Sequence, residues 1–181
     1  MSTTVNSAIA AGIDITADST SSTTGTSTTA ATPHTTIRQV ATTPDWYEPY
    51  KISQAVRAGG FVHVSGQAGI DEEGRTVEGG FLAQGRQAFA NIERVLAAAG
   101  ASLADVVKVT ILVRGMADHL EEVIQLRGEF LDHPYPADTL MEVVSLAQPD
   151  WLIEIDALAL DRGYLHGGSG DAHGGGHRTA A

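Results

Sequence analysis

The segment HPYPADTLMEVVSL, residues 133–146, places an acid where a ligand could be met. Its prolines indicate a turn that leads into an apolar run typical of a strand, and Asp138 stands at the junction. A carboxylate at such a position favours a cationic or polar ligand, such as an amine, an iminium ion or a hydroxylated ring. The alternative is that Asp138 hydrogen-bonds its own backbone, as Asp often does after a proline turn.

Other chemically active groups are few. The chain has no cysteine, which excludes disulfides, thiol catalysis and cysteine–zinc sites. His166, His173 and His177 stand in a glycine-rich tail, and such a tail offers no preformed metal geometry. We therefore expect adventitious metal binding there at most, and no metal site in the protein.

The elements that must position these residues follow from hydrophobic periodicity. Helices are predicted at 82–99 and 116–133, each with one apolar face. Strands are predicted over 52–57, 61–64, 106–115, 139–146 and 151–160. The order β-β-α-β-α-β-β predicts an α+β fold of two layers, a mixed sheet with two helices on one face. The second face of the sheet is then uncovered, and oligomerisation is the simplest way to cover it.

Composition divides the chain into three parts. Residues 1–44 are rich in Ser and Thr, and residues 163–181 are rich in Gly and His. Both lack the apolar area that offsets the entropy of ordering a chain, so we expect disordered extensions. The folded domain is predicted over residues 45–162.

The net charge of −11 argues against nucleic acid and anionic membranes as partners, since both need a positive protein surface. No apolar run approaches the roughly 18 residues of a transmembrane helix. The N-terminus has no basic region of the kind that opens a secretory signal, so the expected location is cytoplasmic.

Four motifs together resemble the Rid/YjgF family, also called endoribonuclease L-PSP and translation-initiation inhibitor. They are, in order, VSGQAGID, QGRQAFANIERVLAAAGASLADVVKVTILV, HPYPADTLMEVVSL and LIEIDALAL, within residues 47–161. The resemblance implies a chorismate-mutase-like (YjgF-like) fold and a homotrimer with small-molecule clefts between subunits. It also implies hydrolysis of reactive enamines and imines to keto acids and ammonia, without a metal or an organic cofactor.

The resemblance also implies roles for individual residues. Glu154, in Ile-Glu-Ile-Asp, matches a Glu that orients the water and is the catalytic candidate. Gly66 belongs to the Ser-Gly-Gln turn that helps to shape the pocket, and Leu140 stands where many members have Cys. Tyr50 matches the pocket Tyr, but its spacing to the next strand differs by about two residues, so Tyr47 stays open.

Position 138 departs from the family. Deaminases of the family carry Arg after Pro-Ala and clamp the substrate carboxylate with it, whereas this chain has Asp138. Two like charges about 4 Å apart at an effective dielectric of about 20 repel by roughly 4 kcal/mol. We therefore expect weak or no hydrolysis of ordinary 2-imino acids. Arg127 could supply a cation from nearby, although a solvated helix residue is the simpler interpretation.

Two functional hypotheses remain. In the first, Asp138 and Glu154 share a cleft, one carboxyl pKa is raised, and Glu154 acts as general base on a different imine or enamine. In the second, the trimer binds or senses a small molecule without catalysis. A shared cleft favours chemistry, and an Asp138 that points elsewhere favours binding alone.

Overall fold

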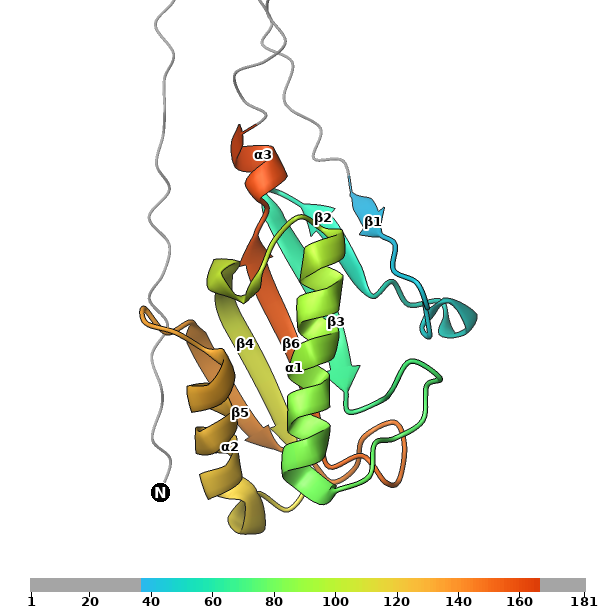
Figure 1. Cartoon of the computed structure of the whole chain (residues 1–181), viewed down its shortest axis with the longest axis vertical. Helices are drawn as coiled ribbons and strands as arrows, with labels where there is room; N and C mark the ends of the chain where they lie inside the picture. The colour runs from blue at the N-terminus through green and yellow to red at the C-terminus, as the bar shows by residue number, and fades with distance from the viewer. Residues whose placement is uncertain (1–36, 167–181) are drawn as a thin grey trace, which may run out of the picture. The chain divides into compact units, whose positions relative to one another are not determined.

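The computed structural model describes residues 37–166, which form one mixed sheet with two long helices on one face (Figure 1). The predicted α+β two-layer fold is confirmed. In chain order the elements are β1 (Arg38–Val40), η1 (Glu48–Tyr50), β2 (Ala55–Ala58), β3 (Phe61–Ala68), α1 (Gly80–Ala98), η2 (Leu103–Asp105), β4 (Val106–Val113), α2 (Met116–Phe130), β5 (Ala137–Glu142), β6 (Ile153–Leu160) and α3 (Arg162–His166).

The strands lie in the order β1-β2-β3-β6-β4-β5. All neighbours are antiparallel except β4 and β5. A parallel pair needs a crossover connection, and α2 supplies it between β4 and β5. The last strand β6 therefore lies in the middle of the sheet, and β5 forms an edge.

The core lies between the sheet and the two helices. Side chains alternate along β6: Ile153, Ile155, Ala157 and Ala159 are buried, and the residues between them are half-buried. Phe89, Ile92 and Leu96 of α1 belong to the same core. The other face of the sheet has no helix over it among residues 37–166, as the sequence predicts for a single helical layer.

Two short elements lie inside the predicted extensions. β1 pairs with β2 and buries Val40 to 4 % exposure, and α3 covers the start of the predicted tail. Three residues are too few for strand periodicity to show in the sequence. The other residues predicted to be disordered, 1–36 and 167–181, lie outside the described part, as do His173 and His177.

Candidate functional site

The candidate site is built around an irregularity in β3. Pairing with β6 is regular up to Val64 and resumes at Gln67, so Ser65 and Gly66 form a bulge. Bulges redirect side chains and are common beside functional sites. Ser65 is held from the two residues before β2, because its N–H donates to the Gln54 carbonyl at 2.9 Å and its hydroxyl donates to the Ser53 carbonyl at 2.7 Å.

Glu154 of β6 lies directly over this bulge. A Cβ added to Gly66 would stand 2.0 Å from Glu154 Oε1 and 2.8 Å from its Cδ. With any larger residue at position 66 the Glu154 carboxylate would have to move away from this place. The role of Gly66 is thus explained sterically, by close approach of a side chain to the strand.

Tyr47 closes the other side of the bulge. Its hydroxyl donates a hydrogen bond of 2.5 Å to the Gly66 carbonyl. The Tyr47 hydroxyl therefore lies beside Gly66, whereas Tyr50 is 70 % exposed on η1. The two-residue difference in spacing is accommodated by a turn in which the N–H groups of Tyr50 and Ile52 bond the Tyr47 carbonyl.

Burial raises the pKa values of the Glu154 carboxyl group and the Tyr47 hydroxyl group. The pKa of Glu154 is raised above its ordinary value, first by burial and then by the negative charge of Asp156. The pKa of Tyr47 is raised to about 12, by burial and then by the charge of Glu154, while the Ala68 backbone acts in the opposite direction. A carboxyl group with a raised pKa can exchange protons closer to neutral pH, and the phenol stays a hydrogen-bond donor.

Asp156 is the acidic neighbour that raises the pKa of Glu154, and no role was predicted for it from the sequence. It stands two residues from Glu154 on the same strand, so both side chains leave the same face. Thr110 of β4 lies opposite it. The signal was present in the sequence as two acids spaced i and i+2 in a strand.

Asn91 fixes the end of β3 from the helical layer. Its side-chain amide, on α1, donates to the carbonyls of Ala68 and Ile70, each at 3.0 Å. Asn91 is 2 % exposed, so these bonds satisfy a buried polar group. It stabilises the strand that carries Gly66 and does not reach the carboxylate.

Asp138 and Leu140 do not join this site within one chain. Asp138 pairs with Val109 of β4, whose side chain is buried under the helices, whereas Glu154 pairs with Leu112. Because strand side chains alternate between faces, Asp138 and Glu154 leave opposite faces of the sheet. Leu140 lies on the side of Asp138 and packs against the main core.

Arg127 of α2 forms an ion pair with Asp138. Arg127 Nε donates to Asp138 Oδ2 at 2.9 Å, and Nη2 donates to Oδ1 at 2.7 Å. The side chains are 30 % and 22 % exposed. The bidentate pair neutralises the acid, so the predicted repulsion of a substrate carboxylate by a free Asp138 does not apply in full. The interpretation of Arg127 as a merely solvated residue is corrected.

A groove of about 410 Å³ lies beside the segment that opens β5. Apolar residues of η2, β4 and the end of α2 line it together with Pro134, Tyr135 and Pro136. Neither Glu154 nor Asp138 takes part. In the described part of the chain, no cluster of three or more His, Asp or Glu could hold a metal ion. No helix between residues 37 and 166 is long and apolar enough to cross a membrane.

Comparison with known proteins agrees with the fold and the motifs. The endoribonuclease L-PSP family model matches residues 40–161. The chain belongs to this family, which is the Rid/YjgF family of the resemblance. A RutC family protein from Pyrococcus horikoshii is 41 % identical over 112 residues, 61 % of this chain and 86 % of its own. The human 2-iminobutanoate/2-iminopropanoate deaminase is 34 % identical, over 68 % of this chain and 90 % of its own.

Solved structures of the family show the same fold. A putative endoribonuclease from Thermotoga maritima superposes with a TM-score of 0.63 at 35 % identity, covering 70 % of this chain and 98 % of its own. RidA from an Antarctic Psychrobacter superposes with a TM-score of 0.57, also at 35 % identity, over 60 % of this chain and 87 % of its own. The family thus includes proteins named as imine deaminases, in keeping with a Rid-like deaminase at the level of the family.

Proposed function

We propose that this chain is a Rid-type hydrolase of a small reactive imine or enamine, with Glu154 as its general base. The observation that carries the proposal is the half-buried Glu154 carboxylate, which lies over the Gly66 backbone beside the Tyr47 hydroxyl. Among residues 37–166 no side chain or backbone N–H donates to this carboxylate, so it is available to a water molecule or a ligand.

The chemistry asks for few groups because an imine carbon is already electrophilic. Glu154 orients a water molecule and takes one of its protons while the oxygen adds to the C=N carbon. The imine nitrogen gains a proton from solvent and a carbinolamine forms. Its C–N bond then breaks to leave a carbonyl compound as the hydroxyl gives a proton to solvent, and the nitrogen departs as ammonia or an amine, or stays attached as an amine where the imine was cyclic. Glu154 returns the proton in the second step, which suits a carboxyl group whose pKa is raised.

The substrate is proposed to lack the carboxylate of a 2-imino acid. Asp138 holds the position of the family's clamp, and its partner Arg127 is already engaged in a bidentate pair. That position therefore offers a substrate carboxylate neither a free cation nor a strong repulsion. An uncharged or cationic imine needs no such clamp.

A direct assay tests the proposal. The purified chain is offered a 2-imino acid and an uncharged cyclic or aryl imine, with the human deaminase as positive control for the first. We expect hydrolysis of the uncharged imine, loss of that activity in Glu154→Gln, and little acceleration with the 2-imino acid. A rate on the 2-imino acid equal to that of the human enzyme would overturn the substrate assignment. Full activity in Glu154→Gln would show that Glu154 is not the general base.

The second candidate is a ligand-binding or regulatory trimer without catalysis. It is favoured by the position of Asp138, which lies on the opposite face from Glu154 and is occupied by Arg127. Ligand binding without turnover, unchanged in Glu154→Gln, would support it. In both cases we propose a cytoplasmic homotrimer with its sites between subunits. The uncovered face of the sheet supports association, and sedimentation of the full chain tests the trimer.

A further inference from the structure

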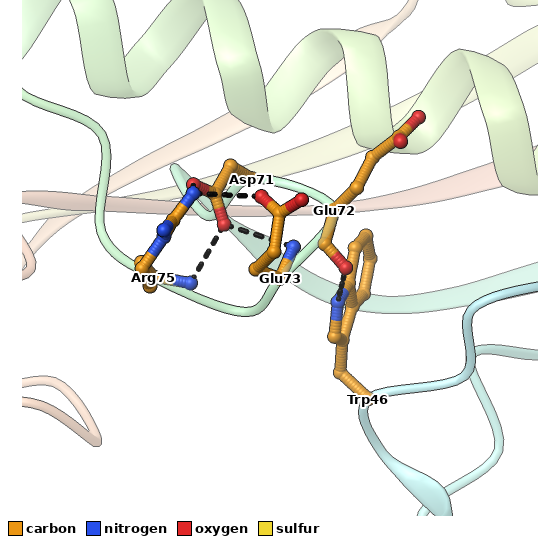
Figure 2. Close-up of polar contacts among 5 residues, drawn as sticks. All are labelled: Trp46, Asp71, Glu72, Glu73 and Arg75. Carbon is orange, nitrogen blue, oxygen red and sulfur yellow. Dashed lines mark hydrogen bonds and ion pairs between the residues drawn. The ribbon is translucent and has the colours of Figure 1, made fainter.

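Trp46, the residue before Tyr47, is held on several sides. The Arg94 guanidinium of α1 lies over its ring, 3.9 Å from the centroid, a distance typical of a cation–π contact. Its indole N–H donates to the Glu72 carbonyl at 3.1 Å (Figure 2). The ring also packs against the small cluster of Ala68, Ile70 and Trp151.

The turn that receives the indole is itself rigidly built. Asp71 Oδ1 accepts the backbone N–H groups of Glu73 and Arg75 at 3.0 and 2.9 Å. Asp71 Oδ2 accepts two bonds from the Arg75 guanidinium, which also reaches Glu73 (Figure 2). Gly74 adopts φ +78°, and a Cβ there would stand 3.3 Å from the Trp46 ring. The turn thus presents one carbonyl and one open surface to the indole.

The turn and the site share one strand. β3 ends at Ala68, two residues after Gly66, and Asp71 follows three residues later. Trp46 therefore attaches the irregular segment before η1 to the same strand end that carries Gly66. The next residue is Tyr47, whose hydroxyl lies on the Gly66 carbonyl.

We infer that Trp46 is a positioning residue, which acts through the 71–75 turn and Arg94 to hold the Tyr47 hydroxyl over the Gly66 bulge. Trp46 does not touch the candidate site itself. The catalytic part of this inference rests on the proposed function, whereas the positional part rests on contacts alone. A second contact, from Asp45 Oδ1 to the Tyr47 N–H at 3.1 Å, fixes the backbone of Tyr47 but not the direction of its ring.

The test follows Tyr47 directly by NMR of protein labelled at the tyrosine Cζ, with Tyr47→Phe to assign the resonance. At pH 11 about nine-tenths of an exposed tyrosine is ionised, whereas Tyr47, with a pKa raised to about 12, is mostly protonated. In Trp46→Leu we expect Tyr47 to lose its protected position and to titrate at least one pH unit lower than in the parent. Trp46→Phe keeps the ring over Arg94 and loses the bond to Glu72, so a smaller shift of the same sign is expected.

Phe130→Leu is the matched control. It removes an aromatic ring of α2 that stacks on Phe89, whereas Trp46 contacts Arg94 of α1. Circular dichroism at each pH checks that the variants are folded. If Trp46→Leu does not fold, Trp46→Phe decides by the same criterion. A Tyr47 titration that is unchanged in the folded tryptophan variants, or lowered equally by Phe130→Leu, overturns the inference.

Turnover separates this inference from the proposed function. If the chain hydrolyses an imine, Trp46→Leu should lower kcat about as much as Tyr47→Phe, and the double variant should lose no more than either single one. Additive losses would overturn positioning through Tyr47. If the parent hydrolyses no imine, the proposed function fails while the NMR titration still decides the role of Trp46.

Discussion

Reversing the charge at position 138 tests how much the ion pair between Asp138 and Arg127 stabilises the fold at this edge of the sheet. Asp138→Arg would remove both hydrogen bonds of the pair. It would also place a second guanidinium against that of Arg127, at the surface, where both side chains keep contact with solvent. The substitution that would create the family's clamp therefore meets a cation already in place.

The cost can be estimated from two contributions. A bidentate, partly covered Arg–carboxylate pair stabilises by about 1 kcal/mol, the upper end for exposed pairs. Two like charges about 4 Å apart add about 1 kcal/mol in a water-like dielectric. We expect Asp138→Arg to lower the free energy of unfolding by about 2 kcal/mol. The swap Asp138→Arg with Arg127→Asp should regain more than half of this loss, because the pair re-forms with reversed polarity.

Urea unfolding of the parent, both single variants and the swap measures this, at one fixed protein concentration because association shifts apparent stability. Repeating it at about 0.5 M salt should reduce the repulsive part, since added salt shortens the screening length. An Asp138→Arg variant as stable as the parent, or a swap less stable than both single variants, would refute the reasoning. If the swap is stable, it is also the better variant in which to look for 2-imino acid hydrolysis.

Three further variants address the site. Glu154→Gln should lower imine turnover by about 10²–10⁴-fold. Glu154→Gln should also stabilise the fold at neutral pH, because the raised pKa of Glu154 means that its ionised form is disfavoured in the folded state. In urea unfolding this gain in stability should disappear as the pH falls below 4.5, the ordinary pKa of a Glu side chain. A gain in stability that persists at low pH would contradict the reasoning. Gly66→Ala should lower imine turnover sharply, because Glu154 Oε1 stands where the new Cβ must go and the carboxylate must move away. Gly128→Ala in α2 has open space around it; it should leave turnover unchanged and stabilise the fold by about 0.5–1 kcal/mol in thermal melts. Equal effects of the two substitutions on turnover would argue against the close approach. Tyr47→Phe should reduce turnover about tenfold or more and Tyr50→Phe should not, and the reverse result in a steady-state assay would return the pocket role to Tyr50.

Much of the fold could be predicted because hydrophobic periodicity is a local signal. The apolar face of α1 and the alternation of β6 are visible in the sequence, and both are buried as expected. β1 was missed, since three residues carry no measurable period and gain their place only by pairing with β2. The uncovered face of the sheet could also be predicted, because two helices cover only one of the two faces of a sheet.

The candidate site was less accessible from the sequence. Glu154 and Gly66 were identified through the motifs, but the motifs could not show that the two are in contact across the β3 bulge. Spacing alone did not show which tyrosine hydroxyl reaches Gly66, because this depends on how the chain turns after Pro44. The effect of Asp156 on Glu154 depends on burial, which the sequence does not show.

The sequence by itself determined the family, the order of helices and strands, and the presence of an acid at position 138. Only the tertiary structure decided what that acid faces. Asp138 and Glu154 are separated by strand pairing and by the alternation of side chains between the two faces of a sheet. The partner of Asp138 comes from α2, 11 residues earlier in the chain. Such a pairing depends on how a helix lies over a parallel crossover, and no local pattern of residues specifies it.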